Sequence, residues 1–188
     1  MFSLGKYLSH SSQNFFLVIL VVSLSLLSGS VLASPFGAGV YGANVPYGGE
    51  TSLTIATNGN VAIAVTPSDS GPLATANGTV TVTSTDVVGY KLYIRALTST
   101  NLTNGANTIA ASANVTPAAL AVNTWGYNID ASTNFAGITL LDVLIRNRTG
   151  PYSAGDITTV TYGVKVDNSK ASGSYATTVI YTAVPQTQ

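Results

Sequence analysis

The stretch GYKLYIRAL, residues 89–97, decides the fold class of this 188-residue chain. Its side chains divide by position into two sets: Tyr90, Leu92 and Ile94 on one face, and Lys91, Tyr93 and Arg95 on the other. A strict period of two residues is the signature of a β-strand with one buried face. The stretch therefore predicts a strand that packs its apolar face on a core.

The same alternation recurs along the chain, separated by turn signals. In GTVTVTST, residues 78–85, Val80 and Val82 point inward and the threonines outward. Asn58-Gly59, between two alternating runs over 53–65, predicts a β-hairpin with a tight turn. Further strands are expected within residues 101–114, 124–129, 137–146, 157–166 and 174–183. About nine short strands and no sustained helical period after the N-terminal segment predict an all-β fold, an antiparallel Ig-like β-sandwich.

The N-terminus has the pattern of a secretory signal peptide. An apolar run, Phe15–Leu27, follows a polar segment and is short for a membrane span of roughly 20 residues. Val31 and Ala33 stand where signal peptidase reads small residues, which predicts cleavage between Ala33 and Ser34 and no membrane span in the mature chain. The alternative is an uncleaved N-terminal anchor. The expected domains are a signal peptide (1–33), a Gly- and Tyr-rich arm (34–50) and a β-sandwich (51–185).

The composition argues against several functional classes. Charged residues make up 7% of the chain and the formal net charge is zero, whereas nucleic-acid binding requires a basic face. The chain has no Cys, and its one His, His10, lies in the predicted signal peptide. The mature chain thus lacks the usual general base, thiolate nucleophile and favoured metal ligands. We expect no enzymatic activity, no metal and no cofactor; a hydrolase would have to rely on acids that are scattered singly along the sequence.

Trp125 and Tyr127, in NTWGYN, are the candidate ligand contacts. Their rings offer apolar faces with a polar edge, on which a sugar can stack; the alternative is that Trp125 fills the core between the sheets. Four N-x-S/T sequons are candidate N-glycosylation sites, at Asn77, Asn101, Asn114 and Asn147.

The second half of the chain carries a resemblance to a known group of proteins. GYKLYIRA, NTWGYNI and TVTYGVKVDNSKASGSYATTVIYTAV, within Val88–Val184, resemble secreted Ig-like surface proteins of reduced-genome bacteria, and are distantly similar to WxL-type cell-wall-associated domains. Tyr181 and Thr182 stand where the WxL signature has a Trp. The resemblance implies an exported, non-enzymatic role at the cell surface and assigns no catalytic residue.

These observations predict a secreted, extracellular or surface-associated protein with a structural or interaction role. The expected partners are other cell-surface proteins or cell-wall glycans. A homo-oligomer is a further expectation. In the arm, Phe36, Ala38 and Val40 alternate, which suits a strand added to the open edge of a sheet; a disordered spacer is the alternative. The competing functional class is a carbohydrate- or wall-binding module that uses Trp125 and Tyr127.

Overall fold

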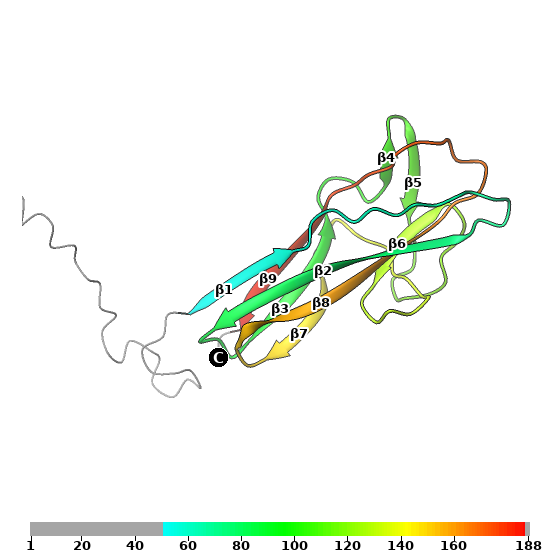
Figure 1. Ribbon diagram of the computed structural model, residues 1–188. Helices are drawn as coiled ribbons and strands as arrows, with labels where there is room; N and C mark the ends of the chain where they lie inside the picture. Colours follow the sequence, from blue (N-terminus) through cyan, green and yellow to red (C-terminus); the bar gives the residue numbers. More distant parts are fainter. Residues whose placement is uncertain (1–50, 187–188) are drawn as a thin grey trace, which may run out of the picture. The chain divides into compact units, whose positions relative to one another are not determined.

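The computed structural model describes residues 51–186, which form nine strands and no helix (Figure 1). In chain order the strands are β1 (Ser52–Thr57), β2 (Leu73–Thr85), β3 (Gly89–Ala96), β4 (Leu102–Asn104), β5 (Asn107–Ala111), β6 (Thr124–Asn128), β7 (Val143–Thr149), β8 (Tyr152–Lys165) and β9 (Val179–Gln186). The all-β prediction is confirmed. The predicted signal peptide, the cleavage site at Ala33 and Ser34, and the arm (34–50) lie outside the described residues. The described residues contain no helix that is long and apolar enough to span a bilayer.

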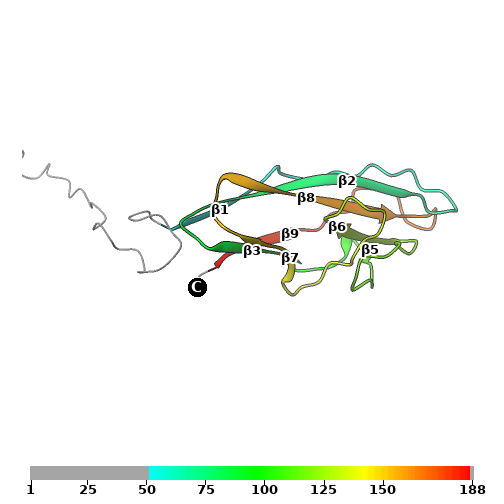
Figure 2. The ribbon, with the colours of Figure 1, turned by 90° about the horizontal axis from the view of Figure 1, so that it is seen from below.

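The strands build two sheets that lie one above the other as two layers (Figure 2). The larger has the order β1-β2-β8-β6-β5-β4 and the smaller the order β7-β3-β9. Every pairing is antiparallel except that of β5 with β6, which is parallel, so an entirely antiparallel arrangement is not what forms. The connection over residues 112–123 is long enough to return the chain to the same end of the sheet, which a parallel pair requires.

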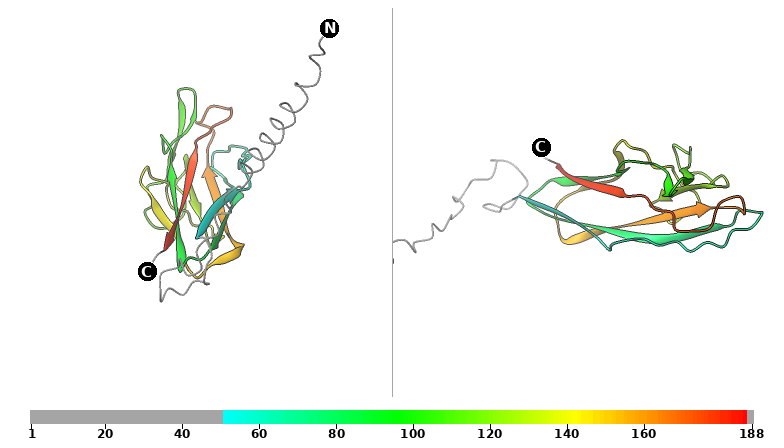
Figure 3. Two further views of the ribbon diagram at one scale, coloured as in Figure 1. Left: turned by 90° about the vertical axis from the view of Figure 1, so that its left-hand side faces the viewer. Right: turned by 90° about the horizontal axis from the view of Figure 1, so that it is seen from above.

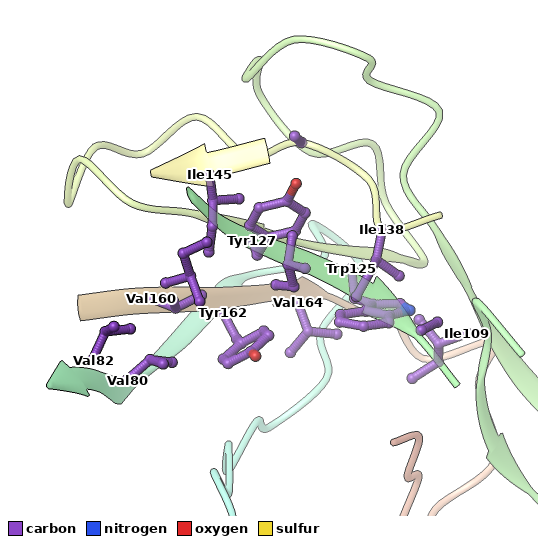
Figure 4. Packing of buried hydrophobic residues seen from close by; sticks show 14 of the residues in the cluster. Val80, Val82, Ile109, Trp125, Tyr127, Ile138, Ile145, Val160, Tyr162 and Val164 are labelled. Atoms are coloured by element: carbon purple, nitrogen blue, oxygen red, sulfur yellow. The ribbon is translucent and has the colours of Figure 1, made fainter. Parts of the chain in front are cut away.

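The core lies between the two layers and is built by the alternation seen in the sequence. Val80 and Val82 from β2 face Leu92 and Ile94 from β3, and all four are at most 1% exposed. Val160 in β8 completes this fully buried centre, and Figure 4 shows it beside the two valines of β2. The predicted inward faces of residues 78–85 and 89–97 are therefore confirmed.

Two strands begin later than the sequence pattern indicates. β7 starts at Val143 rather than at residue 137. Ile138 is buried and the Thr139 carbonyl accepts from Ala96 N–H in β3, but Leu140 and Leu141 are exposed and regular pairing with β3 begins only at Val143. β9 starts at Val179 rather than at residue 174. The preceding segment instead crosses to β4, where Ala176 forms an isolated bridge with Thr103.

The hairpin predicted over residues 53–65 is not formed. β1 pairs with β2, and Asn58 extends that pairing: its N–H donates to the Thr79 carbonyl and its Oδ1 accepts from the Thr79 N–H. Gly59 has a positive φ of 94°, but Asn58 does not, and a primed hairpin turn of the Asn-Gly type needs positive φ at both central residues. Asn58 is held in the β1–β2 ladder, and the chain leaves the sheet edge after it.

Candidate functional site

Trp125 and Tyr127 lie in the core, with exposures of 3% and 5%. Both belong to β6, and Figure 4 shows them among the apolar residues between the sheets. The Trp125 indole N–H donates to the carbonyl of Thr100 at 2.9 Å, and its ring packs against that of Tyr162 at a centroid distance of 6.4 Å. A sugar-stacking platform requires an exposed ring face, and neither ring offers one.

The four sequon asparagines differ in their surroundings. Asn77 and Asn147 are exposed, and Asn101 is half-buried. Asn114 is occupied: its Nδ2 donates to the carbonyls of Ala118, Ala119 and Phe135 at 3.0–3.3 Å. The amide of Asn114 therefore fastens the loop after β5 to the segment around Phe135, a structural role that the sequon pattern does not indicate.

A polar cluster ties one end of the two sheets together. Tyr90 in β3, fully buried, donates its hydroxyl to Asp156 Oδ2 at 2.5 Å, and Arg148 Nε donates to the same oxygen at 2.9 Å. Partial burial raises the pKa of Asp156, but hydrogen bonds from Tyr90 and Arg148, and the charges of Arg148 and Arg146, outweigh it and hold that pKa below its ordinary value. Burial, together with Asp156, raises the pKa of Tyr90. This partly buried carboxylate oxygen thus accepts two hydrogen bonds, one from β3 and one from β7, and links both strands to β8.

A second polar contact joins the layers near their middle. The hydroxyls of Tyr162 in β8 and Tyr181 in β9 hydrogen-bond to each other across the sheets. Burial is the main cause that raises the pKa of both phenols. Both phenols therefore stay protonated to a higher pH than a free tyrosine, and their contact links β9 of the smaller sheet to β8 of the larger one.

The described part of the chain contains no grouping of three or more His, Cys, Asp or Glu side chains that would hold a metal ion. The polar clusters instead contain tyrosine, arginine and one carboxylate, each already paired.

Both sheets are open: over residues 51–186, β1 and β4 end the larger sheet, and β7 and β9 end the smaller one. An open edge presents unpaired N–H and C=O groups to which another strand can add. The β9 edge carries Pro185. Leu97 N–H donates to the Thr178 carbonyl, so the backbone groups of Thr178 and of every second residue after it point toward β3. Pro185 belongs to the other set, whose backbone groups point to the open edge, and it has no N–H to offer there.

The larger sheet has a further, less obvious open edge, along part of β2. β1 covers only the later half of β2, ending where Thr57 lies opposite Val80 and Asn58 bonds to Thr79. The residues of β2 that point the same way as Thr79 are Leu73, Thr75 and Asn77. Within the described range no hydrogen bond joins their edge-facing backbone groups to another residue. The first half of β2 is thus an open edge, because β1, the outermost strand of the sheet, covers only the second half.

Residues 59–66 pass this edge without pairing to it. Val61, Ile63 and Val65 are half-buried and pack on the core, and the residues between them are exposed. The segment makes no hydrogen bond to any described residue. It has the side-chain alternation of a strand without the backbone pairing, and it lies over the inner face of β2 at Gly78.

A groove of about 350 Å³ adjoins the same half of β2. The outward side chains of Leu73, Thr75 and Asn77 form one wall, and Thr161 of β8, residues 131–133 and Phe135 line the rest. The groove therefore lies on the outer face of the larger sheet, on the β8 side of β2. The groove and the open backbone edge therefore share three residues. Sequence reasoning missed both, because a strand's partners are not encoded within the strand itself.

No family model fits the chain, and no curated protein is significantly similar to it.

Proposed function

We propose that this protein is a secreted, non-enzymatic structural or interaction protein of the cell surface, built on an Ig-like β-sandwich, that self-assembles through strand addition. The observation that carries the proposal is the pair of open sheets, and above all the unpaired half of β2. Strand addition gains main-chain hydrogen bonds and places alternate side chains in adjoining pockets.

The amino-acid composition supports this role. Zero net charge and 7% charged residues leave little electrostatic repulsion between copies. The chain is rich in Thr, Ser and Asn, which give it a polar surface without charge. No observation favours a carbohydrate-binding module, because Trp125 and Tyr127 are buried.

The test uses the mature chain, residues 34–188, and a variant that lacks residues 34–48. The proposal expects the native protein in surface or medium fractions, and expects the purified mature chain to form species larger than a monomer in analytical ultracentrifugation. The truncated variant should remain monomeric with a β-type circular dichroism spectrum. Recovery of the native protein from the cytosol alone, or monomeric behaviour of both forms at high concentration, would contradict the proposal.

A further inference from the structure

We propose that the arm (residues 34–50) of one copy pairs with the free edge of β2 at residues 73–78 of the next copy, so that copies join head to tail. This rests on the proposed function, and it adds the acceptor edge and the polarity of assembly. The occupant is a named segment of the same chain, and three features of the described residues select this edge.

The first feature is strand direction. β1 is antiparallel to β2 and begins at Ser52, opposite Thr85, at the end of the molecule where β2 finishes. The start of β2, at Leu73, lies at the other end (Figure 3). An arm that continues β1 backward in a straight line leaves its own molecule and meets the start of β2 in a copy displaced along the same axis. There the arm runs antiparallel to β2, as β1 does.

Insertion into the same copy does not give this pairing. An arm that turned back at Ser52 toward residues 73–78 would run parallel to β2. Parallel pairing is slightly less stable per residue, and the arm would also need a reversal next to β1. Antiparallel pairing in a neighbouring copy requires neither.

The second feature is length. Residues 34–50 span roughly 55 Å when extended at about 3.3 Å per residue, and pairing with residues 73–78 uses about 20 Å of this. The remainder, on the order of 35 Å, is available to connect the acceptor copy to the donor's own β1. The arm is therefore long enough to pair with one copy while joined to the next.

The third feature is the groove on the outer face of the same half of β2. Leu73, Thr75 and Asn77 contribute both the free backbone groups and one wall of the groove of about 350 Å³. Aromatic side chains reach diagonal cross-strand neighbours, so an outward-facing Tyr41 or Tyr47 of an added arm can pack on Thr75 or Asn77, at the near wall of the groove. By contrast, the β9 edge carries Pro185, and β4 spans only Leu102–Asn104.

A head-to-tail contact that does not close into a ring produces a fibre.

The test compares two proline substitutions that remove edge-facing N–H groups. Thr75→Pro removes one from the β2 edge and leaves the β8 side of the strand intact, whereas Thr57→Pro does the same on the outer edge of β1. We expect Thr75→Pro to lower self-association at least tenfold and Thr57→Pro to leave it within twofold of the unmodified chain. Circular dichroism and thermal melting check that each variant is folded.

Disulfide trapping gives a second readout that does not depend on proline. The natural chain has no Cys. Ala43→Cys and Asn44→Cys, one for each face of the arm, are mixed separately with Thr75→Cys, and with Thr54→Cys and Thr182→Cys as controls on β1 and β9. We expect a cross-linked heterodimer in a Thr75→Cys mixture and not in the control mixtures.

The outcomes separate this inference from the proposed function. If the unmodified chain assembles but Thr75→Pro assembles equally well, or if trapping occurs at residue 54 or 182 instead, the acceptor edge is wrong and strand addition stands. If the unmodified chain does not assemble, both proposals fail.

Discussion

A methyl group of Val61 lies against the inner face of β2 at Gly78, where an added Cβ would stand 2.9 Å from Val61 Cγ2. Because Gly78 has no side chain, Val61 can pack at this position, and residues 59–66 lie against the core. The segment thus covers the core beside the open half of β2 and leaves the backbone edge of that strand unpaired.

Gly78→Val should therefore force Val61 away and destabilise the protein by about 1–3 kcal/mol, the usual cost of overpacking. Val61→Ala in the same chain should recover part of the loss, because it removes the methyl groups that the new side chain meets. Urea unfolding of the two single variants and the double variant measures this coupling. Thr79→Val, a neighbour whose side chain points outward, is the matched control. Purely additive effects of Gly78→Val and Val61→Ala would contradict the contact.

Asp156→Asn should lower stability at neutral pH by about 1–3 kcal/mol, because Tyr90 and Arg148 lose a charged acceptor. The pKa of Asp156 is lower in the folded protein than in the unfolded chain. Its contribution is therefore present above the unfolded value, about 3.9, and is lost as the pH falls through the folded value. The difference between Asp156→Asn and the unmodified chain should shrink below about pH 4.

Asp142→Asn is the control for that series. Asp142 and Arg95 pair at 3.5 Å with both side chains substantially exposed, so the substitution should change stability little. Chemical denaturation from pH 2 to 7 compares the three proteins. An equal loss from the two substitutions, or a difference for Asp156→Asn that grows in acid, would show that the contacts of Asp156 with Tyr90 and Arg148 do not act as described.

Tyr181→Phe should change the response to alkali. The phenols of Tyr162 and Tyr181 have raised pKa values in the fold, so their contribution is present below the unfolded value, about 10, and is lost as the pH rises through the folded values. Tyr181→Phe should cost about 1 kcal/mol at pH 7 and should weaken the fall in stability above about pH 10. Tyr175→Phe, which removes a hydroxyl bonded only to a nearby carbonyl, controls for the loss of one phenol. Identical alkaline profiles in all three proteins would refute the prediction.

Asn114→Ala should destabilise the protein by about 1–3 kcal/mol, because three carbonyls lose their shared donor. Asn101→Ala is matched in chemistry and lies in another sequon. Among residues 51–186 only its backbone N–H and carbonyl form hydrogen bonds, both with Ser99, and we expect a change within about 0.5 kcal/mol. Thermal melting of the two variants under one condition tests this. Similar melting temperatures for both would mean that Asn114 does not fasten its loop.

Local patterns predicted the local structure well. Residues 89–97 carry the inward and outward faces of β3 in their own alternation, and residues 78–85 do so for β2. The hairpin predicted at Asn58-Gly59 was wrong, because the side chain and backbone of Asn58 both bond to Thr79, 21 positions away. No local pattern shows that pairing with β2 competes with a turn at this position.

The site was less predictable than the strands. Asp156 reads in sequence as one of several isolated acids, yet Tyr90, 66 positions away, donates to it. For Trp125 the sequence left a core role and a sugar-binding role open, and only the placement of β6 between β5 and β8 decides for burial. The edge of β2 is invisible in sequence, because it exists only where β1 stops.

The most direct test of the central claim is to add a synthetic peptide of residues 34–50 to the chain that lacks residues 34–48. If one copy's arm completes another copy's sheet, the peptide should bind one to one by isothermal titration calorimetry. It should also raise the melting temperature as its concentration increases, since a ligand that binds only the folded state stabilises it by mass action. Thr75→Pro in the truncated chain should abolish both effects, and a peptide of scrambled order should produce neither. Absence of binding by the native-order peptide to the folded, truncated protein at millimolar concentration would contradict the account.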